Sequence, residues 1–240
     1  MNSLPYLPKK EASVFIADCK IENKTVITPP DISSLPPALR RHADLGICIV
    51  SPKKAVCPPE SSAYYGEKLM PYGIEIITGQ THLCSNYPKD SAYNVGIVGK
   101  KCFLNKDVCD SLLYEILISE GYEVIHIRQG YTKCSICPID ENSFITADKG
   151  IYNAGIKSGM DALLISNENI SLPPYPNGFF GGCCGLGSEK ELLINGNIDT
   201  LPDAERLKNF LEKRSINIKS IKEGEVTDIG SIIPLITEST

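Results

Sequence analysis

The stretch CFLNKDVCDSLLYEILISEGYEVIHI, residues 102–127, carries the pattern that predicts the fold. Its apolar start predicts a short strand over 102–105, and its apolar end predicts a second strand over 122–127. Between the two strands, apolar residues recur at helical spacing as far as Gly121, which predicts a helix over 107–120. With a hairpin strand in front, the stretch forms a strand–strand–helix–strand unit.

The same order of elements occurs five times along the chain, with Pro, Asn or Asp as punctuation after the first strands. The predicted first strands are 25–28, 54–57, 102–105, 143–146 and 191–194, and their central residues, expected to be equivalent, are Val26, Val56, Phe103, Phe144 and Leu193. The predicted helices are 33–41, 60–71, 107–120, 149–158 and 203–214. The predicted closing strands are 45–50, 73–78, 122–127, 161–165 and 216–221.

Two of these stretches also resemble each other in sequence. DCKIENKTVIT (18–28) and ICPIDENSFIT (136–146) carry a Cys, an Ile and an Ile-Thr pair at the same spacing, which favours an internal repeat. We therefore predict a single domain over residues 1–240, of mixed α/β class. Its expected units are approximately 12–50, 51–80, 91–127, 134–166 and 180–236. Placed around one axis, they would put short mixed sheets inside and helices outside.

Composition excludes several classes of protein. The 240 residues carry a net charge of −5 and no basic run, which argues against nucleic acid as the main partner. The apolar stretches fall short of the ~20 residues that a membrane span needs, and the N-terminus shows no apolar signal segment. We therefore expect a cytoplasmic protein, without a membrane partner, whose ten cysteines are mostly reduced.

Five segments carry a resemblance to a known fold family. They are HADLGICI (42–49), YPKDSAYNVGIVGKK (87–101), RQGYTKCSICPIDENSFITAD (128–148), LPPYPNGFFGGCCG (172–185) and TDIGSIIPLI (227–236). In these segments the chain resembles the pentein, or guanidine-modifying-enzyme (GME), fold, and more narrowly a clostridial-type group assigned to it. The resemblance implies a five-bladed α/β propeller with pseudo-five-fold symmetry. Other members are arginine and agmatine deiminases, dimethylarginine hydrolases, amidinotransferases and a non-catalytic initiation factor.

The resemblance also implies a kind of chemistry. In the catalytic members a thiolate attacks the guanidinium carbon, a His moves protons and two carboxylates hold the cationic substrate. Their nucleophilic Cys lies in the last repeat, whereas here the corresponding stretch, 227–231, reads TDIGS and no Cys follows Cys184. A Cys-dependent hydrolase or an amidinotransferase-like enzyme therefore needs a different nucleophile.

Cys134 is the candidate nucleophile that remains after the others are considered. It lies in the polar loop 129–135, where Lys133 could favour its thiolate. The alternatives are a small residue packed in a loop, or half of a metal site formed with Cys137 and the vicinal pair at 183–184. Among the other thiols, Cys84 and then Cys184 are the main competitors, and the glycine-rich stretch 179–187 is expected to bring Cys184 close to the axis.

Histidines and carboxylates complete the predicted site. We expect His82, in a coil, and Asp44 to act with Cys134 as catalytic residues. The expected substrate-binding residues are Asp18, His42, Asn94, Cys184 and Asp228, several of which begin or end predicted strands.

Different classes of function remain open at this point. An enzyme acting on a guanidino or amide C–N bond requires a Cys, a His and a carboxylate in one pocket. A catalytically silent binding protein needs only the pocket, and a protein-interaction module would instead expose an apolar patch. We expect a small-molecule ligand, no cofactor, no resident metal, and a possible homo-oligomer.

Overall fold

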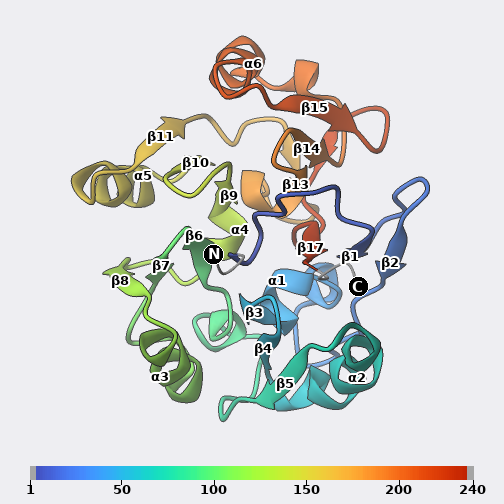
Figure 1. Cartoon of the computed structure of the whole chain (residues 1–240), viewed down its shortest axis with the longest axis vertical. Helices are drawn as coiled ribbons and strands as arrows, with labels where there is room; N and C mark the ends of the chain where they lie inside the picture. The colour runs from blue at the N-terminus through green and yellow to red at the C-terminus, as the bar shows by residue number, and fades with distance from the viewer. Residues whose placement is uncertain (1–3, 237–240) are drawn as a thin grey trace.

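The computed structural model describes residues 4–236, in which five three-stranded sheets share one topology. In each sheet the central strand is antiparallel to one neighbour and parallel to the other. With the central strand in the middle, the sheets are β3 (Cys48–Ser51), β4 (Lys54–Cys57), β5 (Glu75–Thr78); β6 (Gly96–Val98), β7 (Lys101–Leu104), β8 (Glu123–His126); β9 (Ile136–Pro138), β10 (Ser143–Thr146), β11 (Asp161–Leu164); β13 (Cys184–Ser188), β14 (Glu191–Ile194), β15 (Asn217–Ser220); and β17 (Ile233–Leu235), β1 (Val14–Ile16), β2 (Thr25–Ile27). Figure 1 shows the sheets around the centre of the molecule, with the longer helices outside them. The mixed α/β class is confirmed.

Helices make the parallel crossovers in four of the sheets. They are α2 (Pro59–Leu69), α3 (Ser111–Ser119), α5 (Lys149–Lys157) and α6 (Ala204–Glu212). Asp110 caps α3 by accepting a hydrogen bond from the N–H of Leu113, whereas the sequence predicted a start at residue 107. The difference arises because the segment before Asp110 forms a turn, in which the N–H of Cys109 donates to the carbonyl of Asn105.

The remaining helices are short. They are α1 (Ala43–Gly46), α4 (Thr132–Ser135), η1 (Pro37–Leu39), η2 (Met70–Tyr72), η3 (Lys89–Ser91), η4 (Phe180–Cys183) and η5 (Ile198–Thr200). Of the predicted helix 33–41, only η1 is helical, so this prediction is wrong. Pro36 and Pro37 account for the difference, because each lacks the N–H that a continuous helix would use.

The fifth sheet joins the two ends of the described chain. β17 pairs antiparallel with β1, and β1 pairs parallel with β2, so that Phe15 lies opposite Val26. The central strand is therefore β1, and the predicted equivalence of Val26 with the central residues of the other sheets is wrong. The loop 17–24, which contains no helix, replaces the helical crossover of the other sheets. The helical pattern that marks the other repeats is therefore missing from the sequence here.

Two further predictions are wrong because the first unit of the sequence is shifted by one strand relative to the sheets. The strand at 45–50 does not close the first unit but supplies β3, which opens the next sheet. The likeness between 18–28 and 136–146 pairs a third strand with a central one, so these stretches are not structural equivalents. Phe144 is also one position out of register, because Ser143 lies opposite Asp161 as Lys101 lies opposite Glu123.

The core lies along the central strands and between neighbouring sheets. The rings of Phe103 in β7 and Phe144 in β10, both fully buried, lie 5.4 Å apart where these two sheets meet. Gly155 of α5 makes this contact possible, because a Cβ there would lie 2.4 Å from the ring of Phe144. Burying each ring stabilises the fold by roughly 1.5–3 kcal/mol relative to an exposed ring.

A two-stranded parallel sheet positions the loop 172–178 beside Asp228. It consists of β12 (Ile170–Ser171) and β16 (Val226–Thr227). Directly after β16, the N–H of Asp228 donates to the carbonyl of Ser171 at 3.0 Å. The N–H of Gly178 donates to the carbonyl of Ile170 at 2.8 Å. The loop 172–178 and Asp228 are thereby held beside each other.

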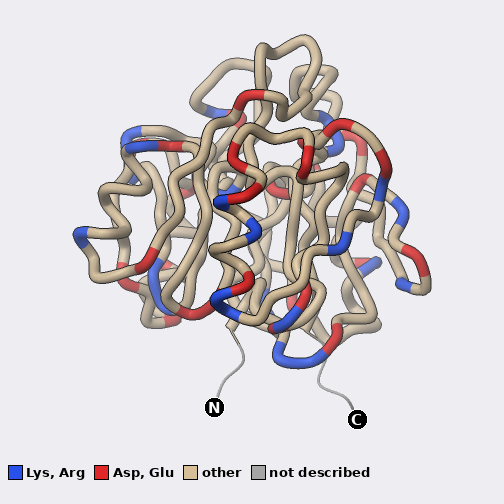
Figure 2. The backbone as a smooth tube through the Cα atoms, turned by 90° about the horizontal axis from the view of Figure 1, so that it is seen from above, with Lys and Arg blue, Asp and Glu red and all other residues tan. Residues whose placement is uncertain are grey.

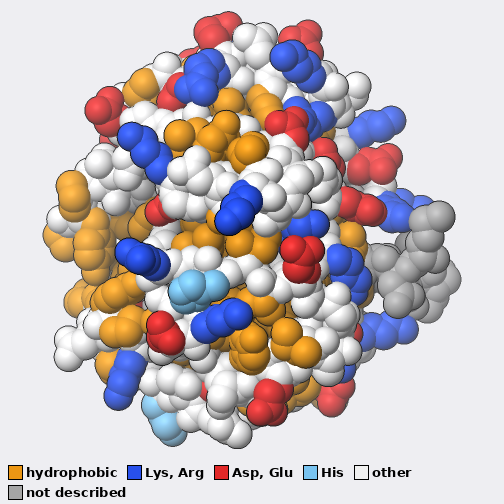
Figure 3. All heavy atoms as spheres, turned by 90° about the vertical axis from the view of Figure 1, so that its left-hand side faces the viewer, with side chains coloured by type: hydrophobic (Ala, Val, Ile, Leu, Met, Phe, Trp, Pro, Cys, Tyr) orange, Lys and Arg blue, Asp and Glu red, His pale blue; other side chains and the backbone are white. Residues whose placement is uncertain are grey.

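The outer surface carries both signs of charge. Figure 2 shows acidic and basic positions interspersed along the chain, and Figure 3 shows the same mixture on the face around α3 and α5. Within residues 4–236, none of the helices combines the length and the apolar character required to cross a membrane.

Candidate functional site

Five short segments, each directly in front of the first strand of a sheet, meet near the centre of the molecule. They are 42–47, 90–95, 131–135, 179–183 and 228–232. Backbone hydrogen bonds join some of them: the N–H of Asp44 donates to Gly230, and the N–H of Ser231 donates to Gly182. Because one end of every sheet contributes a segment, side chains distant in sequence converge here.

The side chain of Asn94 connects three of these segments. Its amide group donates to the backbone carbonyl of Asp44 (2.9 Å) and to the sulfur of Cys134 (3.0 Å). Its carbonyl oxygen accepts from the N–H of Lys133 at 2.7 Å and from that of Cys134 at 3.3 Å. Asn94 is buried, so these bonds hold α4 and α1 together in a fixed orientation.

A buried chain of charged groups lies beside Cys134. The ammonium of Lys133 donates to the hydroxyl of Ser231 at 3.0 Å, and that hydroxyl lies 2.6 Å from Oδ2 of Asp44. All three side chains are almost completely excluded from water. The other carboxylate oxygen of Asp44, Oδ1, is buried without a hydrogen-bond partner among the residues that the structure describes.

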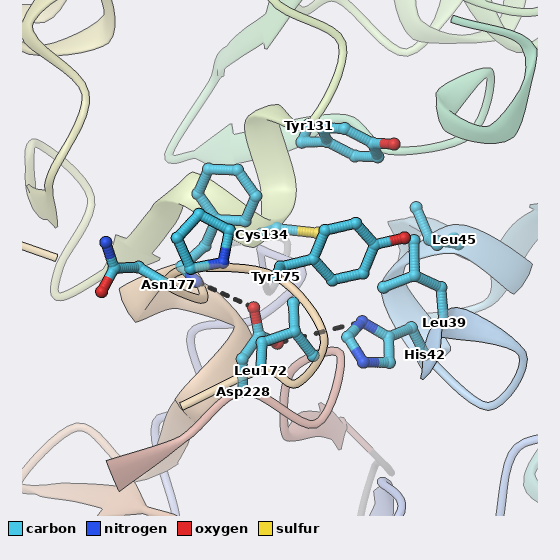
Figure 4. A pocket seen from close by; sticks show the side chains of 11 residues that line it. Leu39, His42, Leu45, Tyr131, Cys134, Leu172, Tyr175, Asn177 and Asp228 are labelled. Atoms are coloured by element: carbon cyan, nitrogen blue, oxygen red, sulfur yellow. Dashed lines mark hydrogen bonds and ion pairs between the residues drawn. The ribbon is translucent and has the colours of Figure 1, made fainter. Parts of the chain in front are cut away.

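A pocket of about 200 Å³ opens beside this chain. Its lining, most of which Figure 4 labels, consists of Leu39, His42, Leu45, Tyr131, Cys134, Leu172, Tyr175, Pro176, Asn177, Phe179 and Asp228. Since a water molecule occupies ~30 Å³ in the liquid, the space suits a small molecule rather than a polypeptide. Three reactive types of side chain, a thiol, an imidazole and a carboxylate, therefore share one small cavity.

The carboxylate of Asp228 is held firmly at the base of this pocket. It accepts hydrogen bonds from the N–H of Phe179 (2.8 Å) and of Gly230 (3.0 Å), and Nδ1 of His42 lies 3.9 Å from its Oδ1. Gly182 makes this position possible, because a Cβ at residue 182 would lie 2.0 Å from Oδ1 of Asp228. The glycine-rich stretch thus serves the close approach of backbone to side chain.

Burial and like charges set the protonation of the pocket. Burial, followed by the carboxylates of Asp44 and Asp228, raises the pKa of the Cys134 thiol well above its ordinary value. Burial also raises the pKa of Asp228, an effect that His42 opposes and Asp44 reinforces. The pocket without a ligand therefore favours a neutral thiol beside negative charge, and a bound cation would reverse that preference.

The structure brings together five of the residues predicted from the sequence. Cys134, His42 and Asp228 line the pocket, while Asp44 and Asn94 lie directly behind Cys134.

Three predicted residues lie elsewhere. The side chain of His82 is 75% exposed and bonds Glu60 at 2.9 Å, so the expectation that it shares a pocket with Cys134 is wrong. Asp18, in the loop between β1 and β2, is paired on the surface with Arg41 at 3.1 Å. Cys184 is buried, and its thiol donates to the carbonyl of Phe180 at 3.1 Å, outside the pocket lining.

Sequence reasoning missed two central residues and the aromatic lining. The sequence indicates Lys133 only as a neighbour that could favour the Cys134 thiolate, whereas in the structure its ammonium donates to the hydroxyl of Ser231. Ser231 itself occupies the stretch where the resembling enzymes carry their nucleophilic Cys, which is the one signal that could have identified it. Tyr175 follows two prolines in the loop 172–178, and no local pattern distinguishes it from an ordinary surface residue.

The cysteines offer no assembled metal site in the described part of the chain. All ten are free thiols, and no group of three or more His, Cys, Asp or Glu side chains within residues 4–236 is arranged to hold an ion.

Solved structures similar to this chain are enzymes that modify guanidino groups. An amidinotransferase of the saxitoxin pathway from Microseira wollei is 11% identical, with 100% of this chain and 98% of that chain covered and a TM-score of 0.61. The inosamine-phosphate amidinotransferase of Streptomyces griseus is 14% identical, with 91% and 77% covered and a TM-score of 0.54. A dimethylarginine dimethylaminohydrolase is 11% identical, with 88% and 92% covered and a TM-score of 0.53.

These similarities show that the chain has the pentein fold, as the resemblance in its sequence implied. No curated protein sequence matches the chain. A family model matches residues 10–233, which is nearly the whole chain. The chain therefore belongs to DUF6873, a family of unknown function.

Proposed function

We propose that the pocket binds a small amidinium or guanidinium cation, and that Cys134 attacks its central carbon in a reaction that breaks a C–N bond. The observation that carries this proposal is the shared cavity of Cys134, His42 and Asp228. A thiol supplies the nucleophile, an imidazole moves protons, and a fixed carboxylate orients a planar cation. The guanidino-modifying activity of the structural neighbours is consistent with this chemistry.

The proposal extends to the architecture. We propose that the five sheets form the blades of a single five-bladed propeller with pseudo-five-fold symmetry, and that the pocket lies at one end of its axis. The shared strand order of the sheets and the meeting of their leading segments support this arrangement.

Electrostatics would make the attack depend on the substrate. Without a ligand, burial and, after it, the carboxylates of Asp44 and Asp228 raise the pKa of the Cys134 thiol and favour its protonated form. A bound cation cancels part of this negative potential and so lowers the pKa of the thiol. The unpartnered Oδ1 of Asp44 is the acceptor that we assign to the thiol proton.

The proposed reaction then proceeds in two halves. As the thiol proton passes to Asp44, the sulfur bonds the amidino carbon, and the bond from that carbon to the leaving nitrogen breaks. The departing amine takes a proton from the imidazole group of His42, to which we assign the role of general acid. In the second half, water or a second amine adds to the carbon and gives a proton to His42, the C–S bond breaks, and Cys134 recovers its proton from Asp44.

A catalytically silent binding protein is the second candidate. Two observations favour it: Ser231 stands where the resembling enzymes carry their nucleophile, and burial raises the pKa of Cys134. Such a protein would bind the same cation without forming a bond to it.

Alkylation by an isosteric pair of reagents separates these candidates. 2-Chloroacetamidine is a cation and 2-chloroacetamide is neutral, and both alkylate thiols. The measured quantity is the ratio of the labelling rate with the amidine to the labelling rate with the amide. We expect this ratio, called the preference, to be about tenfold higher at Cys134 than at Cys84, a partly exposed thiol that serves as the internal control. In Asp228→Asn the preference at Cys134 should fall toward that at Cys84.

Peptide mapping by mass spectrometry reads both sites in one sample. Equal preferences at Cys134 and Cys84, or a preference that Asp228→Asn leaves unchanged, would refute the reactive-thiol proposal. Stabilisation by guanidinium ligands without selective labelling would then identify the binding protein.

A further inference from the structure

We propose that the cation bound in this pocket carries an apolar group and no carboxylate. The inference rests on the proposed function, because it specifies the ligand of the same site. The observations that support it concern the aromatic and apolar residues of the lining, which have no role in the proposed reaction.

Aromatic rings form much of that lining. The rings of Tyr131 and Phe179 lie 5.9 Å apart, and the hydroxyl of Tyr131 is fixed by a hydrogen bond to the buried carboxylate of Asp90. Tyr175 is 38% exposed, and Figure 4 shows it extending across the pocket toward Leu39 and Leu45. Ring faces attract cations, and these rings together with the leucines also favour an apolar substituent.

The charges of the pocket disfavour an anionic group. Among the described residues that line it, Asp228 supplies the carboxylate and His42 the basic group, and neither Lys nor Arg contributes a side chain. The basic side chains next to lining residues in sequence are engaged elsewhere: Arg40 donates to the carbonyl of Leu35, Arg41 pairs with Asp18, and Lys133 donates to Ser231. The imidazole of His42 already faces Asp228, with 3.9 Å between Nδ1 and Oδ1. A ligand carboxylate would therefore lose its hydration beside the carboxylates of Asp228 and Asp44 and would have to compete with Asp228 for His42, which is costly.

Competition between matched ligands tests the inference. Three guanidines are used to protect Cys134 from 2-chloroacetamidine: benzylguanidine, its 4-carboxylate analogue, and methylguanidine, which presents the head group alone. We expect benzylguanidine to give half-protection at a concentration about tenfold or more below that of the carboxylate analogue, and below that of methylguanidine. In Tyr175→Leu, which keeps an apolar side chain but removes the ring, benzylguanidine should lose about threefold or more of its advantage over methylguanidine.

The controls separate this inference from the proposed function. If methylguanidine protects Cys134 but the carboxylate analogue protects as well as benzylguanidine, the inference is overturned and the proposed function stands. If none of the three guanidines protects Cys134, the proposed function fails and the inference fails with it. Thermal unfolding of Tyr175→Leu should match that of the parent protein, because the side chain is partly exposed.

Discussion

Removing one hydroxyl should greatly destabilise this protein. In Ser231→Ala, the ammonium of Lys133 loses its hydrogen-bond acceptor and Oδ2 of Asp44 loses its donor, while both charges stay buried. Hydrogen bonds to charged groups contribute about 1.5–3 kcal/mol each, and breaking a buried charged network typically costs about 3–5 kcal/mol. We therefore expect the free energy of unfolding to fall by about 3–5 kcal/mol, which is a large part of the ~5–15 kcal/mol of a typical domain.

Urea unfolding measures this loss through the midpoint, provided that the slope m is unchanged. Ser119→Ala is the control, because it removes an exposed hydroxyl that donates only to the carbonyl of Ile116, and this loss should cost less than about 0.5 kcal/mol. Ser231→Gly loses the same hydroxyl but relieves a φ of 75°, so it should be roughly 1 kcal/mol more stable than Ser231→Ala. A loss below about 1 kcal/mol in Ser231→Ala would show that the hydroxyl does not join the two charges.

Three further predictions concern the packing and protonation of the protein. In Gly182→Ala the added Cβ would displace the carboxylate of Asp228, so the preference of Cys134 for 2-chloroacetamidine should disappear, as mass spectrometry will show; an unchanged preference contradicts this reasoning. His82→Ala should change neither the labelling of Cys134 nor the melting temperature, and a slower labelling would return His82 to the site. Burial raises the pKa of the Cys102 thiol from 9.0 to about 12, so the folded state holds this proton more tightly than the unfolded state. The contribution of this thiol to the free energy of unfolding is complete below pH 9 and falls by up to about 1.4 kcal/mol per pH unit between pH 9 and 12. Urea unfolding at pH 8 and at pH 10 would detect the fall, and Cys102→Ala should make it smaller.

Local periodicity was sufficient to predict most of the repeated elements. The helical spacing before Gly121 and the apolar strands on either side of it specify a complete unit, and its counterparts at α2, α5 and α6 follow in the same way. Such patterns arise because each element must bury one face against its neighbours. The apolar residues of that face recur at helical or strand spacing, which can be recognised within the element itself.

Contacts between distant segments could not be predicted in this way. The hydrogen bond between Lys133 and Ser231 joins residues 98 positions apart, and neither residue carries a local pattern that names its partner. The pairing of β1 with β17 likewise joins residues 14–16 to residues 233–235, which are far apart in the sequence. The position of His82 in a coil favours a functional role, because loops often carry function, yet its side chain is exposed to solvent beside Glu60 on α2.

The assignment of Cys134 as the nucleophile is best tested by a crystal structure of the protein after reaction with 2-chloroacetamidine. We expect a new thioether at the sulfur of Cys134, with the amidinium group against the carboxylate of Asp228. An adduct confined to other cysteines, or an amidinium group on Cys134 directed away from Asp228, would contradict it.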